Sequence, residues 1–269
     1  MNIKTVVITG SARGLGLEMA KCFREKNFNV VISDLFKKDL EDAKKALLKI
    51  KGHGDIDYFI CDITREKDII NVIDKTKKKY GVIDFWINNA GVNQPNKMIW
   101  DVTSNEIERM INIDLKSTMV ASKLISKVMI EQGCGSIYNV EGHGSNDAII
   151  PGLSIYGTAK RGITYFTMAL AKELECMEVD VMVGRLSPGI MITDFLVNSF
   201  RNKKMKLSEK NKRIYNILGD YPDVVAKYLV NKVINNTNNN VRFNWLNGGK
   251  AVFRFMTAMF NKRDFFKDK

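Results

Sequence analysis

Short runs of β-branched and aromatic residues alternate with helical patterns along most of the chain, and this alternation constrains the fold most strongly. The predicted strands read KTVVITG, NVVISD, DYFICD, IDFWINNAG, GSIYNV and VDVMVGRLSPG. The predicted helices between them cover Leu15–Lys26, Leu40–Lys51, Lys67–Tyr80, Asn105–Glu131 and about Ser154–Met177. Short apolar strands separated by helices are typical of a parallel sheet with helices on both faces. We therefore expect residues 1–269 to form one doubly wound α/β domain of Rossmann type, with residues 190–269 as a mainly helical substrate lid and C-terminal extension.

A glycine-rich turn directly follows the first predicted strand. In TGSARGLG, Gly10, Gly14 and Gly16 are spaced T-G-x-x-x-G-x-G, and Leu15 begins a helical pattern. Glycines at such a turn let the backbone approach a pyrophosphate, which the amides of the helix N-terminus can then bind. The turn predicts a dinucleotide site.

Asp34 ends the second predicted strand, at the position that faces the adenosine ribose in a dinucleotide-binding fold. A carboxylate there accepts hydrogen bonds from both ribose hydroxyls and repels a 2′-phosphate, which favours NAD over NADP. Arg13, Lys37 and Lys38 argue the other way, because their charges could neutralise that phosphate. NAD is the preferred prediction, and NADP stays open.

Further motifs follow the later strands in a fixed order: Asp62 after the third, NNAG after the fourth, and a Tyr156–Lys160 pair beyond the fifth. With the glycine turn they resemble the short-chain dehydrogenase/reductase family over about the first 195 residues. The resemblance implies an enzyme that moves a hydride between nicotinamide and a carbonyl or alcohol substrate. The residues that would bind the cofactor are Gly10, Ser11, Arg13, Gly14, Leu15, Gly16, Asp34, Asp62, Ile63, Asn89, Ala90, Gly91, Tyr156, Lys160, Pro188, Gly189 and Thr193.

Tyr156 and Lys160 are four residues apart in a predicted helix, so their side chains project from one face. A free phenol has a pKa of ~10, and a nearby ammonium group stabilises the phenolate. The family resemblance implies that Tyr156 is the proton donor or acceptor and that Lys160 lowers its pKa and binds the nicotinamide ribose. It also implies that Asn112, in MINIDLKS, holds a water of the proton relay.

The family usually ends its fifth strand in two serines, and the second hydrogen-bonds the substrate carbonyl oxygen. This strand ends in Glu141–Gly142, so the serine aligns with Gly142. The run EGHGS resembles a narrower branch, the chlorophyll b reductases and their bacterial relatives. We expect Ser145, or failing it His143, to replace the serine, while Glu141 either contacts substrate or caps backbone amides. The alternative is a dinucleotide-binding sensor or scaffold that has lost catalysis.

The net charge of +12 belongs mainly to the C-terminal segment. Residues 196–269 contain 16 Lys and Arg against 5 Asp and Glu. Near the end, KAVFRFMTAMFNKRDFF places Lys250, Arg254, Thr257 and Asn261 on one narrow polar stripe of a helix, with apolar residues over the rest. Such a helix has to bury a broad apolar face against its own domain, another subunit or a membrane surface, and Phe265–Phe266 suit an interfacial helix. A peripheral membrane reductase of a lipophilic substrate is therefore a further alternative, and a solvated basic face without a partner is the simpler explanation of the charge.

The sequence lacks the signals of membrane-spanning, secreted, metal-binding and nucleic-acid-binding proteins. The sequence has no apolar stretch long enough to span a bilayer and no signal-peptide pattern at its N-terminus, so we expect a cytoplasmic protein. The four cysteines and two histidines have no metal-binding spacing, and no nucleic-acid motif is present. The expected partners are a small carbonyl or alcohol substrate and further copies of the chain, because family members commonly pair through the helices that correspond to residues 105–131 and 154–177.

Overall fold

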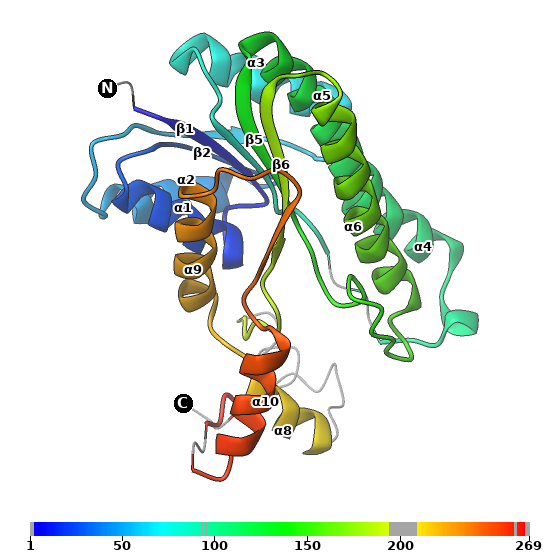
Figure 1. Cartoon of the computed structure of the whole chain (residues 1–269). Helices are drawn as coiled ribbons and strands as arrows, with labels where there is room; N and C mark the ends of the chain where they lie inside the picture. The colour runs from blue at the N-terminus through cyan, green and yellow to red at the C-terminus, as the bar shows by residue number, and fades with distance from the viewer. Residues whose placement is uncertain (1–2, 93, 95, 194–208, 261–262, 267–269) are drawn as a thin grey trace.

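The computed structural model describes residues 3–92, 94, 96–193, 209–260 and 263–266. Its centre is a parallel sheet of seven strands in the order β3-β2-β1-β4-β5-β6-β7 (Figure 1). The strands are β1 (Thr5–Thr9), β2 (Asn29–Asp34), β3 (Ile56–Ile60), β4 (Phe85–Asn88), β5 (Cys134–Val140), β6 (Asp180–Ser187) and β7 (Val241–Asn244). The predicted doubly wound parallel sheet is confirmed.

Helices cover both faces of this sheet (Figure 1). One face carries α1 (Gly14–Glu25), α2 (Lys37–Leu48) and α9 (Pro222–Ile234), and the other carries α3 (Glu66–Tyr80), α5 (Ser117–Gln132) and α6 (Ser154–Glu175). Successive residues of a strand point to opposite faces, so Ile32 packs in the first core while Val31 packs in the second. A strand buried on both sides needs a continuous apolar run, which explains why the predicted strands do not alternate with polar residues.

The helix predicted over residues 105–131 is interrupted. It consists of α4 (Ser104–Met110), a π-helical turn η2 (Ile111–Lys116) and α5, and a short 3₁₀ turn η1 (Ile99–Asp101) precedes it. Thr103 and Glu106 form a capping box that starts α4. Within the π turn the Ser117 N–H donates to the carbonyl of Asn112, five residues back. Such turns shift the register of the residues that follow and are frequent at functional sites.

The C-terminal part contains a strand that the sequence did not predict. β7 pairs with β6 from Gly184–Val241 to Ser187–Asn244. Its four residues are too few to show a period, and they follow an asparagine-rich loop.

After β7 the chain forms α10 (Gly248–Thr257), which contacts α8 (Glu209–Leu218) in a lobe below the sheet (Figure 1). Residues 194–208 of the predicted lid lie outside the described residues. Across the part of the chain that the structure describes, no helix is both long and apolar enough to cross a membrane.

Candidate active site

The glycine-rich turn after β1 and the NNAG loop after β4 lie against each other. β1 and β4 are neighbours at the point where the strand order reverses, which is where open α/β sheets bind nucleotides. The side-chain amide of Asn89 donates to the carbonyl oxygens of Thr9 (3.0 Å) and Gly10 (2.8 Å). Gly10 has a φ of +60°, and a Cβ there would stand 2.6 Å from the Cα of Ala90. The close approach of the two loops therefore depends on a glycine.

The N-terminus of α1 offers donors that fit a diphosphate. The helix begins at Gly14, and its N-cap residue, Arg13, makes no side-chain capping bond. The amides of the first turn have no partner within the helix, and a Cβ on Gly14 would meet no described atom within 4 Å. Exposed Arg13 stands beside this open space. The predicted cradle is present, because unpaired amides at a helix N-terminus attract anionic groups.

The side chains of Ser11 and Leu15, two of the predicted cofactor residues, point away from the cradle. Ser11 is fully buried; its hydroxyl donates to the Ile8 carbonyl (2.6 Å) and accepts the Ser33 N–H (3.1 Å). Leu15 packs in the core between α1 and the sheet. The Ser11 N–H donates to the Ser33 carbonyl (3.1 Å), so the described hydrogen bonds of Ser11 leave it no donor for a cofactor. Of these two residues, only Leu15 keeps a backbone amide in the first turn of α1 for that purpose.

Asp34 and Asp62 stand at the carboxyl ends of neighbouring strands, as predicted. The Asp34 carboxylate accepts the backbone N–H groups of Ala12 (3.1 Å) and Leu35 (2.8 Å), which ties the glycine turn to the end of β2. Asp62 accepts the N–H (3.0 Å) and hydroxyl (2.6 Å) of Thr64 in a local turn. Both carboxylates are half-buried, so each keeps a side that faces solvent.

The segment that contains Pro188, Gly189 and Thr193, all predicted to bind the cofactor, rests on the C-terminal extension. Pro188 is buried, Gly189 has a φ of +74°, and a Cβ on Gly189 would stand 2.7 Å from the Cβ of Leu246, just after β7. Thr193 is half-buried at the end of this segment, and Ile63, another residue predicted to bind the cofactor, packs against the core on the α3 side. Leu246, just after the unpredicted strand β7, thus packs against Gly189 of the predicted cofactor-binding segment.

Tyr156 and Lys160 project from the same side of α6, as predicted. The Lys160 ammonium lies 5.5 Å from the centre of the Tyr156 ring and is buried. A Cβ on Gly142 would overlap the Tyr156 hydroxyl and stand 3.0 Å from Cζ of the same ring. The phenol therefore fills the space that a serine side chain at position 142 would need.

Asp114 is the site residue that sequence reasoning missed. It is fully buried, and its carboxylate lies 3.0 Å from the Lys160 ammonium and accepts the Val92 N–H at 2.8 Å. A Cβ on Gly91 would stand 3.3 Å from Asp114 Oδ2 and 3.5 Å from Lys160 Nζ. Asp114 thus joins the loop after β4 to the Tyr156–Lys160 pair.

Asn112, predicted to hold the relay water, has no described side-chain contact with this pair, whereas Asp114, two residues later in the same π turn, contacts Lys160 directly. The described contact of Asn112 is its carbonyl, which accepts the Ser117 N–H in the π turn. The sequence signal for the missed site residue was Asp114 itself, the charged residue two positions after Asn112 in INIDLKS. A charged residue that becomes buried needs a partner.

The electrostatics favour a protonated Tyr156. Burial raises the pKa of Tyr156, the Lys160 ammonium lowers it, and the Asp114 carboxylate raises it again, with a net rise. For Lys160, burial lowers the pKa, but Tyr156 and Asp114 more than offset that effect, and the net direction is upward. The protein by itself therefore holds a neutral phenol beside an ammonium group.

Ser145 does not occupy the position predicted for a substrate donor. It is buried, its hydroxyl donates to the Lys160 carbonyl (3.2 Å), and it accepts the Gly142 N–H (3.3 Å). A hydroxyl has one proton, and here the backbone of α6 receives it. His143 is half-buried in the same loop, and its Nε2 has no hydrogen-bond partner among the described residues. Burial lowers the pKa of His143, which keeps the imidazole neutral.

Glu141 is buried at the end of β5, where it accepts the Thr164 hydroxyl (2.8 Å) and pairs with Arg242 of β7 (2.7 Å). These described partners are side chains, so the expected capping of backbone amides is not seen among them. A buried carboxylate requires such compensation, and the strand that supplies Arg242 was not predicted.

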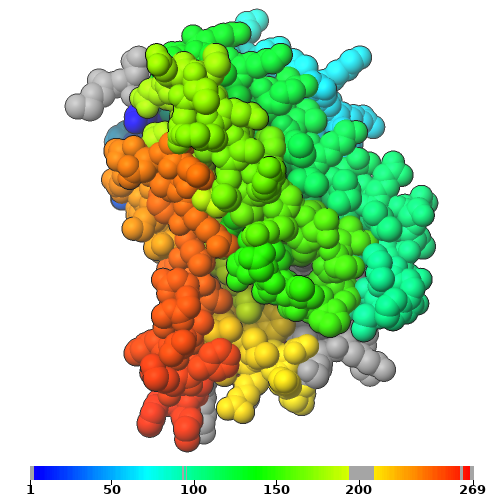
Figure 2. Space-filling view, turned by 45° about the vertical axis from the view of Figure 1, so that its right-hand side comes forward, coloured from blue at the N-terminus to red at the C-terminus, as the bar shows by residue number. Residues whose placement is uncertain are grey.

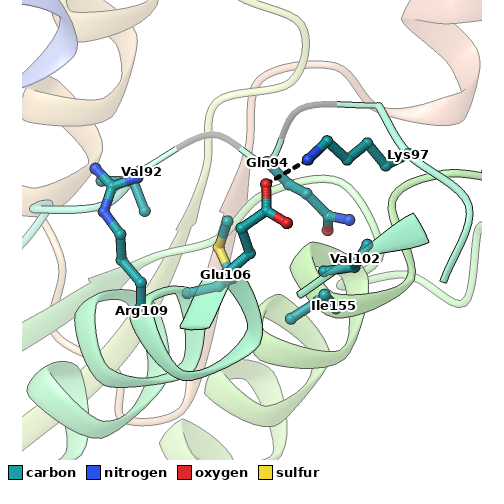
Figure 3. Close-up of a pocket in the computed structure, with 8 residues that line it drawn as sticks. Val92, Gln94, Lys97, Val102, Glu106, Arg109 and Ile155 are labelled. Atoms are coloured by element: carbon teal, nitrogen blue, oxygen red, sulfur yellow. Dashed lines mark hydrogen bonds and ion pairs between the residues drawn. The ribbon is translucent and has the colours of Figure 1, made fainter. Parts of the chain in front are cut away.

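A cavity of about 60 Å³ opens beside the N-terminus of α6 rather than over the Tyr156 hydroxyl. Its lining consists of Val92, Gln94, Lys97, Val102, Glu106, Arg109, Met110 and Ile155. Figure 3 shows the Lys97–Glu106 ion pair across it (2.5 Å) and Arg109 rising from α4 on the other side. Gln94 accepts the Tyr156 N–H (2.9 Å) and donates to the Gly152 carbonyl (3.2 Å). Gln94 therefore couples the cavity wall to the helix that carries Tyr156, a role with no sequence signal.

Comparison with known proteins agrees with this geometry. Residues 4–204 match the model of the short chain dehydrogenase family. The chain is 34% identical over 228 residues to "Chlorophyll(ide) b reductase NOL, chloroplastic" of Oryza sativa subsp. japonica, a match that covers 84% of this chain and 65% of that protein. This chain thus corresponds to just under two thirds of that relative.

Solved structures share the fold. "NAD+-Bound Xylitol Dehydrogenase" superposes with a TM-score of 0.82 at 22% identity, over 92% of this chain and 99% of that one. "ElxO with NADP Bound" gives a TM-score of 0.80 at 24% identity, over 93% and 99%. From the ordered motifs, the geometry at the carboxyl edge of the sheet and the family match, we conclude that the chain belongs to the short-chain dehydrogenase family, in the branch that resembles the chlorophyll(ide) b reductases.

Proposed function

We propose that the protein is an NAD(P)-dependent oxidoreductase that moves a hydride between nicotinamide and a carbonyl or alcohol substrate, with Tyr156 as the proton donor and acceptor. The observation that carries the proposal is the buried Tyr156–Lys160 pair next to the glycine cradle. The nicotinamide, when bound, supplies or accepts the hydride. The chain's own residues position it and move the proton.

Lys160 and Asp114 set the proton balance of the site. The Lys160 ammonium is held by Asp114, and Asp114 is itself held by the Val92 N–H. This arrangement fixes the ammonium close to the Tyr156 ring, where it stabilises the phenolate that remains after proton donation. A sensor or scaffold gains nothing from a buried ion pair beside a phenol, so this geometry favours catalysis.

For the missing serine we propose His143 as the second donor to the substrate oxygen. The Ser145 proton is donated to the Lys160 carbonyl, whereas His143 Nε2 is buried without a partner among the described residues. A neutral imidazole can donate one N–H, and a donor to the developing oxyanion is worth roughly 2–4 kcal/mol of barrier.

We propose NAD as the preferred cofactor. The Asp34 carboxylate is fixed by two backbone amides at the end of β2, so it cannot turn aside to admit a 2′-phosphate without losing them. Arg13 is exposed beside the cradle and is the residue that would favour NADP. Structures of this fold hold either cofactor, so the preference rests on these two side chains.

We also propose a homo-oligomer that pairs through α5 and α6. Their outer faces carry large apolar side chains, Met119 on α5 and Tyr165 and Met168 on α6, which are between 41% and 76% exposed. Side chains of this kind are enriched at interface cores.

The reaction can be tested by a screen of small carbonyls with NADH and of alcohols with NAD, followed by nicotinamide absorbance. Turnover in the parent protein and a loss of at least 100-fold in Tyr156→Phe, with unchanged NADH binding by tryptophan fluorescence, are the expected results. Phenylalanine keeps the ring and removes only the hydroxyl. Equal turnover in the two proteins would contradict the assigned role of Tyr156.

A further inference from the structure

Helix α10 turns the described part of its predicted polar stripe, Lys250, Arg254 and Thr257, toward the protein and its apolar residues to the outside, while Asn261 lies outside the described residues. Arg254 pairs with buried Asp220 (2.7 Å) and donates to the Leu218 carbonyl (3.0 Å). Trp245, just before the helix, donates its indole N–H to Asp220 (2.6 Å), and Arg263, just after it, lies 3.2 Å from the same carboxylate. One buried carboxylate thus fixes which face of α10 is turned inward.

Six large apolar side chains are consequently turned outward, and we refer to them as the outer face of α10. They are between 50% and 87% exposed. The members are Val252, Phe253, Phe255 and Met256 on the helix, and Met259 and Phe260 in the turn that follows it. The helix stands at the lower end of the molecule, beyond the bulk of the domain (Figure 2). A contiguous exposed patch of this kind marks an interaction surface in a protein of this size.

The end of the chain does not cover the outer face where it is described. Phe265 packs edge-on against Tyr221 at 5.1 Å, and Phe266 against Tyr215 of α8 at 6.2 Å. The Phe265 N–H donates to the Asn216 side chain at 3.0 Å. Phe265 and Phe266, which the sequence suggested for an interfacial helix, instead pack against Tyr221 and Tyr215 within the lobe.

The positive charge near α8 and α10 indicates which kind of partner fits the outer face of α10. Lys210 and Arg213 are exposed on α8, which packs against α10, and residues 196–269 contain 16 Lys and Arg against 5 Asp and Glu. A second copy docked through the same face would bring two positive segments together. An anionic lipid surface offers the opposite charge and an apolar layer directly beneath it.

We infer that the outer face of α10 docks on an anionic phospholipid membrane, with its apolar side chains at the headgroup boundary and the α8 cations beside the lipid phosphates. The protein would then work as a peripheral enzyme with the lobe of α8 and α10 on the bilayer. This inference does not depend on the proposed reaction, because membrane binding needs neither cofactor nor substrate.

The test is cosedimentation of the full chain with vesicles of phosphatidylcholine alone and of phosphatidylcholine mixed with phosphatidylglycerol. The expected result is binding to the anionic vesicles that weakens at high salt and is at least tenfold weaker to the neutral ones. The triple variant Phe253→Gln/Met256→Gln/Phe260→Gln should lose at least tenfold in binding. The matched control, Leu48→Gln/Ile70→Gln, changes exposed apolar residues on α2 and α3 and should bind like the parent.

Circular dichroism and NADH titration establish that the triple variant is folded, and Lys210→Gln/Arg213→Gln tests the charge separately with the apolar face intact. Absence of vesicle binding in the parent, or binding by the folded triple variant at the parent's level, would overturn the inference. Light scattering without vesicles tests the other possible occupant of the outer face of α10, a second copy of the chain. If the parent self-associates and the triple variant does not, the face belongs to a second copy and the membrane inference is wrong.

Discussion

The Asp114 carboxylate lies 3.0 Å from the Lys160 ammonium inside the protein, with neither side chain more than marginally exposed to solvent. The same carboxylate accepts the Val92 N–H of the loop that follows β4. One residue of the π turn therefore sets both the position of the lysine and the local charge at Tyr156. In the proposed reaction, the pH dependence is therefore expected to depend on Asp114 as well as on the Tyr156–Lys160 pair.

Asp114→Asn should move the pH profile of carbonyl reduction toward lower pH. Reduction needs a protonated Tyr156, and Asp114 raises the pKa of that phenol. Without the negative charge the phenolate forms at lower pH, so the decline of reduction at high pH begins earlier, while alcohol oxidation extends to lower pH. Asparagine keeps an oxygen for the Val92 N–H. Asn112→Ala is the matched control, and its profile should coincide with that of the parent; a displaced profile there would restore the role expected from the sequence.

Gly142→Ala and Gly142→Ser should both reduce kcat by at least tenfold, and to a similar extent. A Cβ alone at this position overlaps the Tyr156 hydroxyl, so the added serine hydroxyl gives no benefit. Steady-state kinetics of the two variants measure this. A Gly142→Ser enzyme markedly faster than Gly142→Ala would show that the family's serine can work here after all.

His143→Ala should lower kcat by about 10²–10³-fold with little change in cofactor affinity, because it removes a donor to the developing oxyanion. His143→Gln keeps a side-chain N–H near the position of Nε2 and should recover part of the rate. Turnover and NADH titrations of both variants provide the measurement. Full activity in His143→Ala would leave Tyr156 as the sole donor among these groups.

Ser145→Ala should act on stability rather than on chemistry. The buried hydroxyl bonds the Lys160 carbonyl and the Gly142 N–H, and leaving such partners unsatisfied costs about 1–3 kcal/mol. Urea unfolding should show this loss of free energy, while kcat falls by less than tenfold. A hundredfold fall in kcat with unchanged unfolding would contradict the structural role and support the catalytic one expected from the sequence.

Asp34→Asn should raise the affinity for NADPH relative to NADH, because the neutral side chain no longer repels a 2′-phosphate and still accepts one backbone amide. Arg13→Ala should change the ratio in the opposite direction. Fluorescence titrations of both cofactors against the parent and the two variants measure it. If Asp34→Asn leaves the ratio unchanged, another residue determines the preference.

The sequence by itself determined the sheet from β1 to β6, the cofactor edge and the tyrosine–lysine pair, whereas β7 was not predicted. Each of these depends on local spacing: apolar runs of strand length, glycines at a strand-to-helix turn, and two side chains one helical turn apart. Parallel strands bring their carboxyl ends to one edge, so motifs that follow successive strands had to meet there whatever the details of packing.

Only the tertiary structure decided which polar groups complete the site. Asp114, in the π turn, contacts Lys160 and the Val92 N–H, and the Ser145 hydroxyl is bound to the backbone of α6. The inverted orientation of α10 follows from buried Asp220, far from the helix in sequence. Burial and pairing of charges depend on neighbours brought together by folding, and a periodic pattern along one segment contains no information about them.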